Sequence, residues 1–269
     1  MNHLEAKSLC FSREGRGTVL SDISFGIPAG RRLAILGANG AGKTTLLSLL
    51  GGRLKADRGE ILMDGISIAG YSPRALAGKI AFLPQIERLP FNYKVLEFVL
   101  MGRAPHIPPL SMPGPGDEAK ARAALAELGL EPLADRRAGE ISGGEFQLAR
   151  IARCLAQEAD LLLLDEPTSL LDPANAQRVA KELGALADRG KTIVFSTHDL
   201  ALALALADEA ILLHGAGILC RGQPSAILQP GLLGTAYGVD FRMMEFPSTY
   251  THASTLQPVA GKPDGAALP

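Results

Sequence analysis

The chain has 269 residues and a net charge of −1, with 47% of its residues hydrophobic and 20% charged. Such a chain can bury the core of one globular α/β domain with a smaller subdomain. The balanced charge excludes a strongly basic surface, so no nucleic-acid partner is expected, and no apolar run is long enough to span a bilayer. The three cysteines lie far apart, which is typical of a reducing compartment and predicts small core or surface residues at Cys10, Cys154 and Cys220.

The first part of the chain is predicted to form antiparallel β-structure. Short strands are expected from Leu4 to about Ile27 around a turn at 15–17, and the stretch 20–27 alternates apolar and polar side chains. Residues 59–66 are typical of a hairpin, because an Asp-Gly pair stands at their turn. A small antiparallel sheet is therefore expected beside the main sheet.

The middle of the chain changes to helical patterns after a short strand at 79–85. Residues Val95–Met101 have helical character, and 105–116 is a loop rich in Pro and Gly. Asp117 is predicted to be the N-cap of a helix that runs to Leu128. These features define a helical subdomain at about residues 88–155.

The last part of the chain alternates strands and helices. Leu161–Leu164 is an apolar run too short for a helix, and it is typical of a buried parallel strand. Asp172 and Pro173 predict the start of a helix that extends to about Asp188. The other predicted elements are strands at 192–197 and 209–213 and a helix at 199–207. An α/β fold with a mostly parallel sheet is expected, followed by a loosely structured tail at 251–269.

A glycine-rich turn, Gly37–Thr44, joins the apolar run Leu33–Leu36 to a helical pattern. A buried strand, a glycine turn and a helix N-terminus form an anion cradle, because unpaired N–H groups of the first helical turn point at the ligand. Lys43 would contact the β- and γ-phosphates of ATP, and Thr44 would offer its hydroxyl to Mg²⁺. The residues predicted to hold the nucleotide are Gly37, Asn39, Gly40, Ala41, Gly42, Lys43, Thr44 and Thr45.

Candidate catalytic residues follow two of the predicted strands. Ligands of open α/β sheets bind beyond the carboxyl ends of the strands, where Asp165 and Glu166 follow the run 161–164. Asp165 would hold Mg²⁺, and Glu166 would accept a proton from the water that attacks the γ-phosphate. His198, after the strand 192–197, would contact the same phosphate and carboxylate. The alternatives are a solvated turn for the acidic pair and an ordinary polar strand exit for His198.

Two more candidates lie where the helical region begins and ends. Gln85 ends its strand and would contact Mg²⁺ or the attacking water, unless it is an ordinary loop residue. Ser142 and Glu145 have the spacing of a capping box, which could indicate only a capped helix. The two glycines between them also expose backbone N–H groups, which predicts a second anion site. That site would consist of Ser142, Gly143, Gly144 and Glu145.

Taken together and in this order, the segments resemble the ATP-binding subunits of ABC transporters. Gly37–Thr44 is similar to the Walker A motif, and 141–145 is similar to the signature motif, with Glu145 in place of the usual glutamine. The other similarities are Gln85 to the Q-loop, Leu161–Asp165 with Glu166 to Walker B and its catalytic base, Ser169–Asp172 to the D-loop, and His198 to the H-loop. The resemblance implies an ABC ATPase domain over residues 1–250.

The resemblance also implies that two copies of the chain dimerise head to tail. Each ATP would lie between the Walker A motif of one copy and the signature of the other, where Ser142 and Gly144 bind the γ-phosphate. Asp172 of the D-loop is expected among the nucleotide-binding residues. Arg13 stands where relatives usually place an aromatic residue under the adenine, and its guanidinium would either stack on the base or remain surface charge.

Val95–His106 and Leu232–Asp240 resemble a subfamily that imports iron-siderophores, haem, cobalamin and some oxyanions, although 95–101 could be only an amphipathic core helix. The resemblance implies a peripheral subunit on the cytoplasmic face of the inner membrane. It would contact the permease near Gly102–His106, with Arg103 as a candidate, and serve a periplasmic or surface substrate-binding protein indirectly. The expected cargo is an iron-siderophore or related metal chelate, with haem, cobalamin or a molybdate/tungstate-type oxyanion as alternatives.

Three other classes fit the sequence less well. A soluble ABC ATPase of DNA repair or translation generally has a long coiled coil or two cassettes, and the interval from Lys43 to Ser142 leaves no room for a coiled coil. A P-loop kinase would not need the signature segment or the pair formed by Glu166 and His198. The segment Gly102–His106 argues against an exporter.

Overall fold

The computed structural model describes residues 2–15, 17–87, 89–169, 171–244 and 255–258. Its centre is a six-stranded sheet in the order β10-β9-β3-β8-β7-β6, in which only β10 runs antiparallel to its neighbour. The strands are β3 (Arg32–Leu36), β6 (Ile80–Leu83), β7 (Leu161–Asp165), β8 (Thr192–Ser196), β9 (Glu209–His214) and β10 (Gly217–Gly222). The predicted mostly parallel sheet is therefore confirmed.

Both faces of this sheet are covered, which explains the unbroken apolar run of β7. Leu161 and Leu163 pack into one core together with α1 (Lys43–Leu50), whereas Leu162 and Leu164 pack into the other core with the helices that follow β6. Successive side chains of a strand point to opposite faces, so a strand buried on both sides is apolar at every position.

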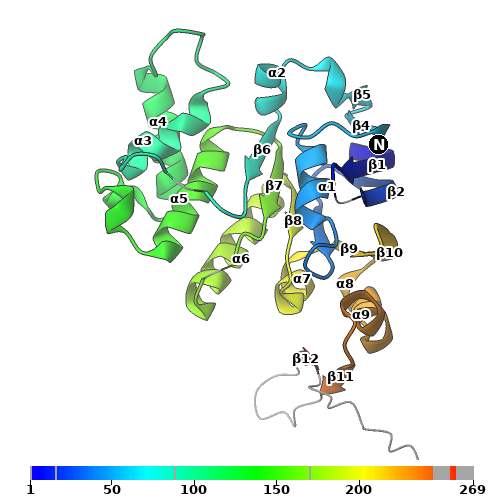
Figure 1. Cartoon of the computed structure of the whole chain (residues 1–269). Helices are drawn as coiled ribbons and strands as arrows, with labels where there is room; N and C mark the ends of the chain where they lie inside the picture. The colour runs from blue at the N-terminus through cyan, green and yellow to red at the C-terminus, as the bar shows by residue number, and fades with distance from the viewer. Residues whose placement is uncertain (1, 16, 88, 170, 245–254, 259–269) are drawn as a thin grey trace, which may run out of the picture.

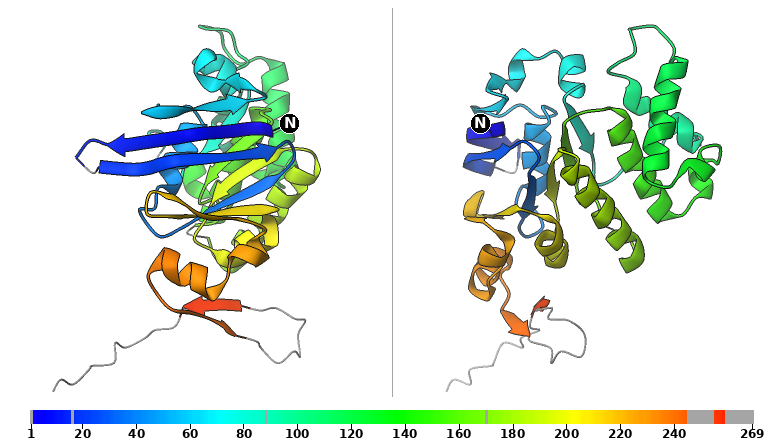
Figure 2. Two further views of the ribbon diagram at one scale, coloured as in Figure 1. Left: turned by 90° about the vertical axis from the view of Figure 1, so that its right-hand side faces the viewer. Right: turned by 180° about the vertical axis from the view of Figure 1, so that it is seen from behind.

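The N-terminal β-structure forms a second sheet in the order β2-β1-β4-β5. Its strands are β1 (Asn2–Arg13), β2 (Gly17–Pro28), β4 (Arg58–Met63) and β5 (Ile66–Ser67). The first two form one long hairpin rather than the short strands expected (Figure 2). The predicted Asp-Gly turn is confirmed, with positive φ at both Asp64 and Gly65, as such a two-residue turn requires. This sheet and the main sheet enclose α1.

The helical block is inserted between β6 and β7, which are adjacent parallel strands, and it lies at one side of the molecule (Figure 1). Its elements are α3 (Val95–Leu100), η2 (Met101–Arg103), α4 (Pro115–Glu127), η3 (Glu131–Leu133), η4 (Ala138–Glu140) and α5 (Gly143–Ala156). The remaining elements are η1 (Ile68–Gly70), α2 (Pro73–Ala77), α6 (Pro173–Asp188), α7 (Leu200–Leu206), α8 (Pro224–Ile227), α9 (Pro230–Tyr237), β11 (Phe241–Met244) and β12 (Thr255–Pro258).

The predicted start of α4 is wrong by three residues. The N-cap is Gly114, and Asp117 lies inside the first turn, where its carboxylate accepts the Gly114 N–H at 3.0 Å. This contact, followed by a hydrogen bond from Arg103, holds the pKa of Asp117 below its usual value. An acidic side chain at the third helical position reaches back to the N-cap amide, so it resembles a cap in sequence without being one.

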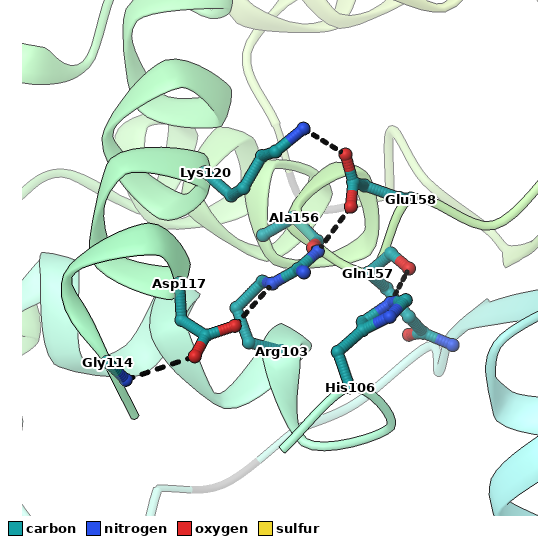
Figure 3. A network of polar contacts seen from close by, with 8 residues as sticks. All are labelled: Arg103, His106, Gly114, Asp117, Lys120, Ala156, Gln157 and Glu158. Carbon is teal, nitrogen blue, oxygen red and sulfur yellow. Dashed lines mark hydrogen bonds and ion pairs between the residues drawn. The ribbon is translucent and has the colours of Figure 1, made fainter. Parts of the chain in front are cut away.

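The expectation that Arg103 contacts a partner is also wrong. Its side chain is 8% exposed and is held inside the helical block by three groups (Figure 3). The guanidinium donates to Asp117 at 3.2 Å, to the Ala156 carbonyl at 2.7 Å and to Glu158 at 2.8 Å. Arg103 therefore joins η2 to α4 and to the end of α5, and its charge is used within the block.

The predicted tail at 251–269 lies largely outside the described residues. The part that is described, β12, pairs antiparallel with β11. Among all described residues, no helix combines the length and hydropathy needed to cross a membrane. The cysteines are free thiols, and burial raises the pKa of Cys154 to about 11.

Candidate functional site

The phosphate loop needs glycine for steric reasons. Gly42 precedes α1 with φ +98°, and a Cβ there would approach Leu20 Cδ2 to 2.8 Å. Gly37, at φ +145°, would bring a Cβ to 2.7 Å from the Leu213 carbonyl oxygen. Only glycine adopts such conformations without strain, so the loop can fold tightly between β3 and α1 and leave its N–H groups directed outward.

Lys43 is buried at the base of this loop. Its ammonium group donates to the carbonyl oxygens of Gly37 at 2.7 Å and Ala38 at 3.1 Å. Burial lowers the pKa of Lys43, and the carboxylates of Glu166 and Asp165 oppose that effect. The charge is therefore fixed in position beside both acidic residues.

A cavity of about 770 Å³ opens beside the loop, which is within the size range of small-molecule sites. It brings together most of the residues that the sequence analysis singled out. Those present in its lining are Arg13, Asn39, Gly40, Ala41, Gly42, Lys43, Thr44, Thr45, Gln85 and Glu166. An adjoining cavity is lined by Gly37 and His198, again with Gln85 and Glu166.

Glu166 and His198 form a direct pair at the carboxyl edge of the sheet. Nδ1 of His198 lies 2.8 Å from Oε2 of Glu166, and Glu166 is 9% exposed whereas the imidazole is 62% exposed. Glu166 has φ +49°, a conformation that costs a non-glycine residue about 1–3 kcal/mol. The backbone of Glu166 is thus held in a strained conformation, with the carboxylate against the imidazole and the residue in the lining of the phosphate-loop cavity.

Ser196 on β8 fixes the two acidic residues, and the sequence analysis missed it. Its hydroxyl donates to Asp165 at 2.5 Å and accepts the Glu166 N–H at 2.9 Å. Asp165 and Ser196 are register partners of the parallel strands β7 and β8. A serine at the end of a buried strand carries no distinctive signal until that register is known.

The oxygen-bearing side chains at this edge fit a magnesium ion. Thr44 and Gln85 line the cavity, and the buried carboxylate of Asp165 lies at the adjacent strand end. Magnesium binds through one or two carboxylates together with hydroxyl, phosphate and water oxygens, so this donor set is suitable for it.

The loop that carries Gln85 is tied to α5 by a buried ionic cluster. Arg150 is 7% exposed and donates to Glu87 at 3.3 Å, to Gln147 at 2.5 Å and to the Pro84 carbonyl. Arg153 adds a second bond to Glu87 at 2.5 Å. Gln147 also donates to the Pro167 carbonyl at 2.6 Å. One helix therefore fixes both the Gln85 loop and the loop after Glu166.

The segment 142–145 does not join the phosphate-loop cavity. The capping box is confirmed, because the Ser142 N–H donates to Glu145 at 2.8 Å and the Glu145 N–H donates to Ser142 Oγ at 3.2 Å. Hydrogen bonds from the backbone N–H and the hydroxyl of Ser142 to the carboxylate lower the pKa of Glu145. Asp172 caps α6 as predicted, and it is likewise absent from the described cavity lining. Ser142 and Gly143 are exposed at the tip of α5; Leu170 lies outside the described residues.

Residues 20–169 match the ABC transporter family, and this stretch contains the phosphate loop, the capped tip of α5 and the acidic pair. The chain belongs to the ABC transporter ATPase family. The cassette is thus the ATP-binding, ATP-hydrolysing part of a transport system, and cassettes of this family work as dimers with transmembrane subunits.

Known relatives cover most of the cassette. It is 37% identical over 240 residues to the hemin import ATP-binding protein HmuV of Pseudomonas fluorescens (strain Pf0-1), covering 87% of the chain and 92% of that protein. It is 35% identical over 235 residues to the achromobactin transport ATP-binding protein CbrD of Dickeya dadantii (strain 3937), covering 87% of each. A solved structure of a metal-chelate type ABC transporter in an inward-facing conformation matches with a TM-score of 0.86 and 34% sequence identity. The match covers 96% of the chain described here and 98% of the chain in that structure.

The cassette also places an unpredicted residue at its site. Tyr237, the last residue of α9, lines both cavities beside the phosphate loop. The sequence of the segment 232–240 indicates a subfamily resemblance and no role at the nucleotide site. Nothing local marks Tyr237 as a site residue, because its position depends on how α9 packs against the body of the cassette.

Proposed function

We propose that this cassette hydrolyses ATP to drive the import of a metal chelate, and that the chelate is a haem or an iron-siderophore. The observation that carries the hydrolytic part is the Glu166–His198 pair, which stands beside the buried ammonium of Lys43. The import direction and the cargo rest on the functions of the relatives named above, two of which handle hemin and achromobactin.

In the proposed reaction, the phosphate loop and Lys43 bind the β- and γ-phosphates of ATP. Glu166 accepts a proton from the water that attacks the γ-phosphate, and His198 orients the carboxylate and contacts the phosphoryl oxygens. Thr44, Gln85 and Asp165 hold Mg²⁺, which would neutralise charge on the phosphates. Arg13, which also lines the cavity, stacks on the adenine through its guanidinium.

Ser142, Gly143, Gly144 and Glu145 act on the nucleotide of a second copy. The support for this is the position of the segment, since Ser142 and Gly143 at the tip of α5 are exposed and the segment is absent from the lining of the cavity of its own chain. A head-to-tail dimer would bring this tip and Asp172 to the phosphate loop of the other copy. The γ-phosphate then links the two copies, and its loss lets them separate.

The cassette binds peripherally to a permease at the cytoplasmic face of the inner membrane, and a substrate-binding protein delivers cargo on the other side. Of the segment 102–106, Gly102 and Arg103 are buried, whereas Ala104 and His106 are exposed. The contact region is therefore assigned to the exposed residues that follow Arg103.

The decisive experiment combines hydrolysis and transport. Glu166→Gln is expected to bind ATP normally, to form a stable ATP-dependent dimer and to lose phosphate release. Parental turnover by this variant would show that Glu166 is not the base. Cells that lack the cassette are then complemented with the parental gene and tested for growth on hemin, on a ferric siderophore, on cobalamin and on limiting molybdate. Rescue on molybdate alone would overturn the metal-chelate assignment.

A further inference from the structure

Helix α9 brings one aromatic side chain to the phosphate loop. The helix packs against β9, the neighbour of β3 in the sheet, and it ends at Gly238, which has φ +70° (Figures 1 and 2). The ring of Tyr237 lies edge-on to Phe241 with centroids 5.8 Å apart. The same side chain lines the cavity that contains Gly37, Glu166 and His198.

The hydroxyl of Tyr237 is buried near the backbone of Gly37, and among the described residues it forms no hydrogen bond of ordinary geometry. Buried tyrosine hydroxyls usually find a partner, because leaving one without a hydrogen bond costs free energy. A phenylalanine in place of Tyr237 would pack against Phe241 equally well. The hydroxyl therefore requires an explanation other than the hydrophobic core.

The surroundings of the hydroxyl indicate an acceptor that arrives with the nucleotide. Burial raises the pKa of Tyr237, a backbone contact with Gly37 opposes this shift, and the nearby Glu166 carboxylate adds to it, so the phenol keeps its proton at neutral pH and can donate it. Oε2 of Glu166 is already paired with His198. The space that Tyr237 shares with Gln85, Glu166 and His198 is the end of the site where the terminal phosphoryl group is proposed to lie.

We infer that the hydroxyl of Tyr237 donates a hydrogen bond to the terminal phosphoryl group of bound ATP. Helix α9 is then part of the nucleotide site and helps it to distinguish ATP from ADP, which lacks that group. The inference rests on the proposed orientation of the nucleotide, with its γ-phosphate toward Glu166 and His198.

The test removes one oxygen atom. Tyr237→Phe keeps the ring, and Tyr93→Phe is the matched control, because Tyr93 also packs a half-buried ring edge-on to a phenylalanine, 5.8 Å away in the helical block. The affinities of the full chain for ATP and for ADP are measured without Mg²⁺, so that no hydrolysis occurs. The initial rate of phosphate release is measured separately with Mg²⁺.

Tyr237→Phe is expected to weaken ATP binding about tenfold, which is the size of one hydrogen bond to a charged group, and to leave ADP binding unchanged within about twofold. Phosphate release should fall as well, and Tyr93→Phe should change none of these values. An unchanged ATP affinity, or an equal loss for ATP and ADP, would overturn the inference. Either result would leave the proposed role of Glu166 intact, because Glu166→Gln tests that role separately.

Discussion

Arg150 provides the sharpest test of how the helical block is joined to the site. Arg150→Met retains most of the aliphatic stem but removes the guanidinium that binds Glu87, Gln147 and the Pro84 carbonyl. Three hydrogen bonds at about 1 kcal/mol each suggest a loss of about 3 kcal/mol. Burial lowers the pKa of Arg150, so desolvation of the charge offsets part of this gain. Glu87 also keeps its bond to Arg153. A net destabilisation of about 2 kcal/mol is expected.

The free energy of unfolding in urea is the appropriate measure, with Arg122→Met as the control. Arg122 is 40% exposed and, among the described residues, pairs only with Glu118 on the same helix, so its loss should cost about 0.5 kcal/mol or less. ATP hydrolysis by Arg150→Met should also fall, because the Gln85 loop and the loop after Glu166 lose their common support. If the two variants unfold at the same urea concentration, the cluster makes no net contribution to stability and the reasoning is refuted.

Three further predictions concern residues in different parts of the molecule. Ser142→Arg should abolish phosphate release while a single chain still binds ATP, because Ser142 serves the other copy; retained turnover would contradict the two-chain site. Arg13→Ala should weaken binding of both ATP and ADP by about threefold, the size of an exposed cation–π contact, and an unaltered affinity would show that no stack forms. Cys154 is buried and its pKa is raised to about 11, so it should react slowly with maleimide in the native protein. The half-buried Cys10 and Cys220 should react faster, and mass spectrometry can follow the modification of each cysteine. Labelling of Cys154 at the rate of Cys10 would contradict its burial.

Local signals in the sequence predicted much of this structure. The capping box at Ser142, the Asp172 cap and the Asp-Gly hairpin turn each depend on a few neighbouring residues, and each was confirmed. The phosphate loop was predictable for the same reason, since glycine, lysine and the following helix occur consecutively.

Most of the failures come from long-range contacts, and the exception is Asp117, whose role is decided within one helical turn. Asp117 has the composition of a cap, but the backbone of Gly114 begins the helix. The sequence around Arg103 does not predict its burial, because its partner Glu158 is distant in the chain. Ser196 and Tyr237 enter the site through strand register and helix packing, neither of which leaves a local pattern.

The insertion between β6 and β7 has a consequence for how such proteins diversify. These two strands are parallel neighbours, and β6 is the edge strand of the main sheet, so the intervening chain leaves at the carboxyl end of β6 and returns at the opposite edge of the sheet, to the amino end of β7. Its outer helices can drift in length and sequence, provided that α5 keeps the contacts that fix the Gln85 loop and the loop after Glu166. A new uptake system could thus arise by reshaping the outer helices of this insertion, while α5 and the strands that carry the acidic pair are inherited unchanged.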